Sequence, residues 1–195
     1  MSTTPRARRR LARTRTTPDA VAVAPFTVVV DTREQLPWDF ADIPADAHQG
    51  GPAGGCVVVP VVVDTLGAGD YSVRGWESRV AVERKSAADL VGTIGQGRER
   101  FERELERLAV MDFATVAVEA ELSELKLNPP PHSQLQFKTI TRSVQAWQQR
   151  YPRVHWMFLP GRRAAMLWGY RVLERWVKER ERERGKEGAE VEAGQ

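Results

Sequence analysis

Two charged side chains, Glu83 and Lys85, lie two residues apart at the end of a predicted strand in the segment VAVERKSAADL. Because successive side chains of a strand point to opposite faces, Glu83 and Lys85 project together and Arg84 projects away from them. A carboxylate beside an amine suits metal-dependent hydrolysis. The carboxylate binds the metal, and the amine orients or deprotonates a water or offsets charge on a phosphoryl group. On its own, an E-x-K pair is more often a solvated ion pair, so the hypothesis requires further acids nearby.

Two aspartates supply such acids. Asp70 follows Gly69 at the start of the preceding predicted strand, and a tight hairpin places Asp70 near Glu83. Asp31 ends the apolar run FTVVVD (26–31), which predicts a buried strand. Ligand sites in such sheets favour the carboxyl ends of strands, so we expect these acids and Lys85 to converge on one edge of the sheet.

The predicted metal is Mg²⁺. This ion prefers oxygen ligands and takes only a few from the protein, so Asp31, Asp70 and Glu83 suffice as ligands. A zinc site is not expected, because the histidines are scattered along the sequence. They are His48, His132 and His155.

Four segments together resemble the nuclease domain of the XPF/Mus family, whose members are structure-specific endonucleases. They are VVVDTRE (28–34), GDY (69–71), ERKSAADL (83–90) and GQGRERF (95–101), and the similarity extends over about residues 26–177. The family pattern is D-x-R-E, then G-D, then E-R-K-x-x-x-D. The resemblance implies a restriction-endonuclease-like fold and cleavage of DNA phosphodiesters that depends on Mg²⁺ or Mn²⁺.

The resemblance also implies roles for eight residues, and the intact E-R-K motif favours an active subunit. The implied positions are metal ligands at Asp31, Asp70 and Glu83, catalytic residues at Lys85 and Arg84, and supporting residues at Arg33, Glu34 and Asp89. Family members often continue into a tandem helix-hairpin-helix domain. We expect none in the charged segment ERERERGKEGAEVEAGQ, so the junction specificity of the family cannot simply be carried over.

Several of these residues have a structural alternative. Ser86 and Asp89 fit a capping box at the start of a helix, which is enough to explain Asp89. Arg84 can brace the fold through an acid such as Glu34 if the strand is regular. Arg33 and Glu34 can equally form a simple ion pair.

Arg98 is the candidate DNA-binding residue. It follows Gly95 and Gly97 at a predicted helix start, where free N–H groups and the helix dipole bind phosphates. The alternative is an ordinary i,i+4 ion pair between Arg98 and Glu102.

The elements that position these residues predict a single α/β domain with a mixed central sheet flanked by helices. A run of strands comes first, and helices then alternate with strands. A short helix opens at Ser86 and is interrupted by GTIGQG (92–97), and LKLNPPPHS (125–133) forms a connection rich in helix breakers. We expect strands at 26–31, 56–66, 78–85, 113–120 and 153–160, with Pro60 disturbing the second, and a further strand that starts within the turn-containing segment 67–75. The longer helices are expected at 98–111, 133–150 and from 162 to beyond 180.

Charge and composition suggest three segments. The net charge of the 195 residues is +3, and residues 1–20 hold six arginines and one aspartate, so the basic balance belongs to this arm. We expect a disordered basic arm over 1–24, the nuclease domain over 25–178, and a charged helix end with a disordered tail over 179–195. The arm either binds polyanions or is an organellar targeting peptide.

Location follows from what the sequence lacks. It has one cysteine, Cys56, and no apolar run suited to a secretory signal or a membrane span. We expect a cytoplasmic, nucleoid-associated protein, or a nuclear one if the source is eukaryotic, and not a secreted one.

The last predicted helix carries two apolar stripes, which suggests a partner. One contains Met166, Tyr170, Leu173 and Val177, and the other contains Trp168, Val172 and Trp176. We expect a homodimer through this helix, with a heterodimer as the alternative.

The function expected is endonuclease activity at branched, flapped or nicked DNA in repair or recombination. The alternatives are a DNA-binding scaffold subunit that does not cut, and a sequence-specific restriction-type nuclease.

Overall fold

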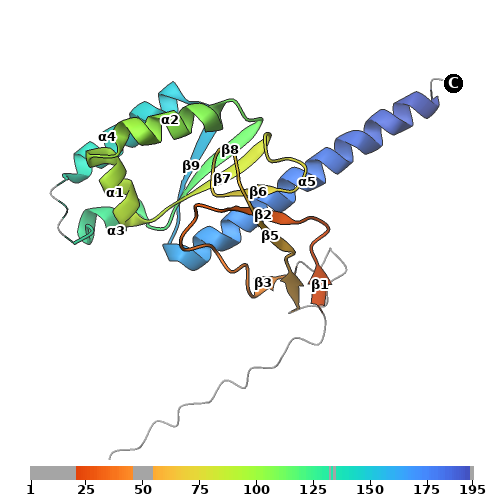
Figure 1. The fold of residues 1–195 in the computed structure, drawn as a ribbon, viewed down its shortest axis with the longest axis horizontal. Helices are drawn as coiled ribbons and strands as arrows, with labels where there is room; N and C mark the ends of the chain where they lie inside the picture. Colours follow the sequence, from red (N-terminus) through yellow and green to blue (C-terminus); the bar gives the residue numbers. More distant parts are fainter. Residues whose placement is uncertain (1–20, 46–54, 132, 134, 194–195) are drawn as a thin grey trace, which may run out of the picture.

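A mixed six-stranded sheet forms the centre of the molecule (Figure 1). The computed structural model describes residues 21–45, 55–131, 133 and 135–193. The strand order is β5-β2-β6-β7-β8-β9, with β2 antiparallel to β6, β6 antiparallel to β7, and the remaining neighbours parallel. The bounds are β2 Val28–Asp31, β5 Val61–Asp64, β6 Tyr71–Val73, β7 Val80–Lys85, β8 Phe113–Val118 and β9 Val154–Phe158.

Helices cover both faces of this sheet, which confirms the predicted α/β class. One hydrophobic cluster packs the face beneath α1, α2, α3 and α4, and a second packs the face crossed by α5. Figure 1 shows α5 running behind the sheet and continuing well past it. The bounds are α1 Ala87–Gly95, α2 Arg98–Ala109, α3 Leu122–Leu127, α4 Phe137–Arg150 and α5 Gly161–Ala193. No helix in the described part of the chain is long and apolar enough to cross a bilayer.

A second, small sheet packs beside the main one. It consists of β1 (Val21–Val23), β4 (Cys56–Val58) and β3 (Ile43–Pro44), in the order β1-β4-β3. The strand predicted over 56–66 is therefore wrong as one strand. Pro60 lies between β4 and β5, where it lacks the N–H that a ladder needs, and the two halves join different sheets.

The helix boundaries bring further corrections. The first helix is not broken at GTIGQG, because α1 continues to Gly95. The connection after β8 contains the short helix α3, and α4 begins at Phe137 instead of Ser133. Residues 1–20 of the expected arm lie outside the described residues, whereas its end forms β1. Helix α5 continues to Ala193, through most of the segment for which we expected a helix end and a disordered tail.

The alternation of side chains along β7 decides which residues meet. Val80 and Val82 belong to the cluster under α5, while Ala81 belongs to the cluster under α2. Continuing this alternation, Glu83 and Lys85 project toward α2 and Arg84 projects toward α5.

Candidate active site

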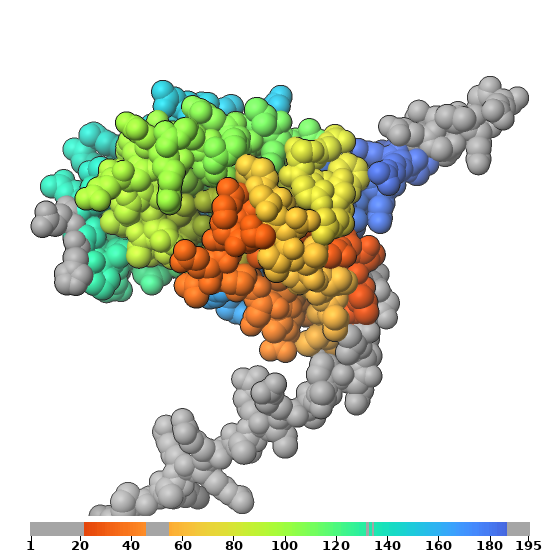
Figure 2. Space-filling view, in the orientation of Figure 1, coloured from red at the N-terminus to blue at the C-terminus, as the bar shows by residue number. Residues whose placement is uncertain are grey.

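A cavity of about 450 Å³ opens between the segment that follows β2 and the helices α1 and α2. These parts lie next to one another on the face seen in Figure 2. Most of the lining residues are charged. They are Asp31, Arg33, Gln35, Gly69, Asp70, Glu83, Lys85, Thr93, Arg100, Phe101, Glu104 and Arg107.

Three carboxylates reach this cavity from three adjacent strands. Val30 pairs with Tyr71, and Tyr71 pairs with Val82. Continuing the register by one residue places Asp31 opposite Asp70 and Asp70 opposite Glu83. The Asp31 N–H donates to the Asp70 carbonyl at 2.8 Å, as the β2–β6 register requires. The Asp70 N–H donates to the Val82 carbonyl at 3.0 Å, one residue short of Glu83, so the β6–β7 ladder is irregular at this point and Asp70 still lies next to Glu83. The hairpin predicted to bring Asp70 to Glu83 is confirmed.

Gly69 sets the path of the chain into Asp70. Its φ is +73°, and an added Cβ would lie 2.8 Å from the Cβ of Ala81. A side chain would therefore be strained by both conformation and space. The Gly69 N–H donates to Oε1 of Glu104 on α2 at 2.8 Å, which ties this turn to the helix across the cavity.

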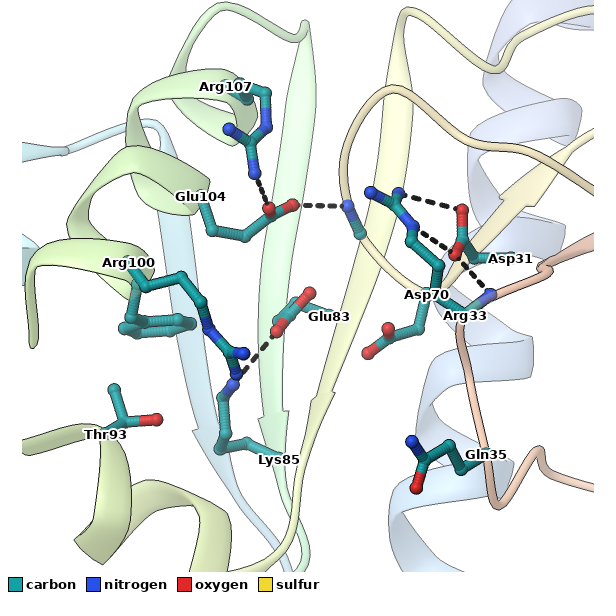
Figure 3. Close-up of a pocket in the computed structure, with 12 residues that line it drawn as sticks. Asp31, Arg33, Gln35, Asp70, Glu83, Lys85, Thr93, Arg100, Glu104 and Arg107 are labelled. Atoms are coloured by element: carbon teal, nitrogen blue, oxygen red, sulfur yellow. Dashed lines mark hydrogen bonds and ion pairs between the residues drawn. The ribbon is translucent and has the colours of Figure 1, made fainter. Parts of the chain in front are cut away.

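Asp31 is held by four hydrogen bonds. Its carboxylate accepts from the backbone N–H, Nε and Nη2 of Arg33 at 2.8, 2.7 and 3.0 Å, and from the Leu66 N–H at 2.7 Å (Figure 3 draws the Arg33 bonds). Burial raises the pKa of Asp31, but the hydrogen bonds from Arg33 and Leu66 outweigh burial, so its pKa lies below the usual value. Asp31 is therefore ionised, and both of its oxygens are engaged.

Asp70 and Glu83 are in the opposite situation. Burial and the charge of Glu83 raise the pKa of Asp70 to about 8, against which the Arg84 N–H bond to Asp70 Oδ2 at 2.7 Å is a partial offset. Burial raises the pKa of Glu83, and the charge of Lys85 offsets this only in part. Because these two facing carboxylates are difficult to ionise at the same time, a cation bound between them would stabilise the ionised form of both.

Lys85 lies beside this pair and is almost fully buried. Its Nζ is 3.0 Å from Oε1 of Glu83 and 4.2 Å from the centre of the Phe101 ring. The ion pair and the cation–π contact fix the ammonium group next to the two acids. This is the acid–amine arrangement that the alternation of β7 predicted.

The donor set of the cavity suits a hard divalent cation in part. Asp70 and Glu83 are oxygen donors with few other partners, and Mg²⁺ is commonly held by one or two carboxylates. However, the described residues contain no group of three His, Cys, Asp or Glu side chains arranged to hold a metal ion. Asp31 lines the same cavity, but its oxygens face Arg33 and Leu66. The three-carboxylate ligand set expected from the sequence is thus only partly assembled.

The Arg84 side chain does not line the cavity, although we expected Arg84 among the catalytic residues. On the α5 side of β7, its Nε and Nη2 donate to the two oxygens of Glu119 at 2.7 and 2.8 Å. Its Nη1 lies 3.4 Å from Glu34. Trp38 Nε1 also donates to Glu119, at 2.9 Å. The bracing role through Glu34 is confirmed, and Glu34 does not form a simple pair with Arg33.

Asp89 and Arg98 also take their structural alternatives. The Asp89 N–H donates to Oγ of Ser86 at 3.1 Å, and that hydroxyl donates to the Asp89 carboxylate at 2.6 Å. Arg98 lies 3.5 Å from Glu102, donates to Oγ of Ser143 at 2.5 Å, and stacks over the Trp147 ring. Neither side chain lines the cavity, so the expected phosphate contact of Arg98 is not supported.

Several cavity residues were missed by sequence reasoning, above all Arg100, Glu104 and Arg107 on α2. A signal for them exists in the helix pattern. They follow i, i+4, i+7 spacing and each lies one residue from the buried stripe of Phe101, Leu105 and Leu108. This spacing places them at one border of the face that packs on the sheet. Gln35 and Thr93 carry no comparable signal.

Comparison with known proteins identifies the family and the fold of this chain. The family model described as the ERCC4 domain matches residues 30–168. The structure of XPF from Aeropyrum pernix is similar, with a TM-score of 0.56 and 19% identity over 86% of this chain and 73% of that chain. A structure of XPF from Aeropyrum pernix in complex with DNA gives a TM-score of 0.49 and 22% identity over 79% and 66%. No curated protein matches. The XPF-type resemblance and the fold are confirmed.

Proposed function

Because this chain belongs to the ERCC4 domain family, a family of nucleases, we propose that it is a divalent-metal-dependent DNA endonuclease that cuts branched, flapped or nicked DNA in repair or recombination. The observation that carries the proposal is the cavity in which Asp31, Asp70 and Glu83 meet beside Lys85. Facing carboxylates with raised pKa values beside a fixed ammonium are typical of a functional site and costly for a purely structural one.

Each side chain has a role in the proposed reaction. Asp70 and Glu83 would hold Mg²⁺ or Mn²⁺, and Asp31 would join them if its oxygens were released from Arg33. The bound metal supplies an activated water and stabilises charge on the scissile phosphate. Lys85 orients the attacking water, or offsets negative charge that develops on the phosphoryl oxygens. Glu104 holds the Gly69 turn and so positions Asp70.

The test is cleavage of labelled nicked, flapped and forked DNA with Mg²⁺ or Mn²⁺. Glu83→Ala and Lys85→Ala should each abolish cleavage, because they remove a metal ligand and the fixed cation. Glu106→Ala is a matched control, since Glu106 lies exposed on α2 and does not line the cavity. Circular dichroism must show that all variants are folded. Full activity of both cavity variants on all three substrates would refute the assignment. Binding without cleavage by the wild-type chain would favour a scaffold role.

We also propose that the active form is a homodimer through α5, with a heterodimer as the alternative. Met166, Tyr170, Leu173 and Val177 are buried against the sheet. In the other stripe Trp168 and Val172 are half-buried and Trp176 is buried, and the three line a groove of about 510 Å³. The apolar residues of that groove are Phe113, Trp168, Val172 and Trp176. Light scattering at high concentration should show a dimer that Val172→Glu dissociates, and a clean wild-type monomer would contradict the proposal.

A further inference from the structure

Three arginines reach the cavity, and two of them already have acidic partners. Arg33 donates to Asp31 and to the Leu66 carbonyl, and Arg107 pairs with Glu104. Arg100 has no hydrogen bond or ion pair with any residue in the described part of the chain. The guanidinium of Arg100 is therefore the one in this cavity that is available to an anion without first breaking a contact within the described protein.

The position of Arg100 is fixed by the helix that carries it. Phe101, Leu105 and Leu108 are buried and anchor α2 on the sheet. Figure 3 shows the Arg100 side chain extending from α2 into the cavity, toward Lys85. The Phe101 ring, adjacent in sequence, lies under the ammonium of Lys85. One turn of α2 thus places the Arg100 guanidinium in the cavity and, through Phe101, contacts the Lys85 ammonium.

Lys85 and Arg100 converge in the cavity, and only Lys85 has an acidic partner among the described residues, so this place favours an anionic ligand. Glu83 is the ion-pair partner of Lys85, and the described residues contain no carboxylate that pairs with Arg100. A phosphate offers oxygens to both groups, and the planar guanidinium can donate two parallel hydrogen bonds to one phosphate. Among the described residues that line the cavity, the aromatic one is Phe101, and it is only 4% exposed, so it offers no face for stacking a base.

We propose that Arg100 is the residue that binds the DNA phosphate at the cleavage site. Its guanidinium donates to non-bridging oxygens on the α2 side, and Lys85 faces the same phosphate from β7. This inference rests on the proposed nuclease function and assigns the phosphate contact to Arg100, in place of the Arg98 expected from the sequence. Arg98 is already engaged by Glu102, Ser143 and Trp147.

The experiment compares Arg100→Gln, Arg100→Lys and Arg103→Gln in the full chain. Arg103 is the matched control, because it lies on the same helix, is exposed, and does not line the cavity. The probe is a fluorescein-labelled flapped DNA duplex. Its binding is measured by anisotropy in EDTA over a range of salt concentrations, and its cleavage is measured with Mg²⁺ as kcat and KM.

Arg100→Gln should lower kcat by about 10²-fold, as loss of a charge-stabilising donor does. It should also reduce the slope of log affinity against log salt by about one, the signature of one lost phosphate contact. Arg100→Lys should keep the salt slope but recover only part of kcat, because a lysine cannot donate as a fork. Arg103→Gln should leave kcat and the slope near wild type.

Equal effects of Arg100→Gln and Arg103→Gln on kcat and slope would overturn the inference. The outcome also separates the two proposals. If wild type binds the duplex but never cuts it, the nuclease proposal fails, while a slope change specific to Arg100→Gln still supports the phosphate contact. If wild type cuts and Arg100→Gln is indistinguishable from it, the nuclease proposal stands and the role of Arg100 is wrong.

Discussion

On the α5 side of β7, Arg84 donates to both oxygens of Glu119, which also accepts from Trp38, and Glu34 lies at 3.4 Å. On the cavity side of the same strand, Glu83 has one cationic partner, Lys85, and faces Asp70. Burial is similar on both sides, because the Arg84 and Glu119 side chains are each 8% exposed and that of Glu83 is 9% exposed. The difference lies in how the charges are partnered.

The pKa values express this difference. Burial raises the pKa of Glu119, but the hydrogen bonds from Arg84 and Trp38 outweigh burial and lower it below the usual value. Burial and the charge of Glu83 instead raise the pKa of Asp70 to about 8. On the α5 side, the environment of Glu119 favours its ionised form. On the cavity side, the environment of Asp70 disfavours its ionised form. Such a cost of ionisation is typical of a functional site, and under the proposed function the missing partner is a divalent cation.

The largest expected effect comes from Asp70→Asn. The amide can still accept the Arg84 N–H bond, but it removes the negative charge that faces Glu83. Cleavage should fall by about 10²–10³-fold or more, in the range seen when one stabilising group is removed from an active site. In EDTA at pH 8, the free energy of unfolding of Asp70→Asn should be on the order of 1 kcal/mol higher than that of wild type. A stabilisation of this size is typical when a costly feature of a functional site is removed.

Thermal unfolding with and without Mn²⁺ sharpens this test. Wild type should gain stability with Mn²⁺, and Asp70→Asn should gain much less. The control is Asp64→Asn, which removes an exposed acid at the end of β5 and should change neither cleavage nor the response to Mn²⁺. A destabilised Asp70→Asn in EDTA would show that the facing acids are not a source of cost.

The second prediction breaks the other side of the strand. Arg84→Met leaves Glu119 and Glu34 buried without their main cation, so it should destabilise the fold by about 3–5 kcal/mol. The matched control is Arg79→Met, at the start of the same strand segment, where the ion pair with Asp112 is half exposed. That change should cost about 0–1 kcal/mol. Urea unfolding measures both, and similar values for the two variants would contradict the bracing role.

The sequence predicted the contacts on the cavity side of β7 more completely than those on the α5 side. Alternation and the hairpin register are local rules, and they predicted that Asp70, Glu83 and Lys85 meet. Glu119, the main partner of Arg84, lies 35 residues away, just after another strand, and no local pattern links the two. The bond from the Leu66 N–H to Asp31 spans 35 residues in the same way. Contacts of this kind depend on how separate elements pack, which periodicity does not encode.

Sequence reasoning named Arg98 and did not consider Arg100, for a related reason. Helical periodicity gives the angle between two side chains around α2, but not the rotation of α2 against the sheet. The buried positions Phe101, Leu105 and Leu108 fix that rotation. They turn Arg100 toward the cavity and Arg98 toward Ser143 and Trp147.

The smallest expected effect concerns Asp89, which follows β7 and belongs to neither side. The Ser86 hydroxyl accepts the Asp89 N–H, so Ser86 caps α1 through the backbone whichever side chain residue 89 carries. Asp89→Ala should therefore cost only about 0.5 kcal/mol, the low end for a capping interaction, whereas Ser86→Ala should cost about 1 kcal/mol. Cleavage by Asp89→Ala should stay within a few-fold of wild type, because its carboxylate does not reach the cavity. A loss of cleavage comparable to that of Asp70→Asn, with stability unchanged, would instead place Asp89 in the chemistry that the E-R-K-x-x-x-D motif implies.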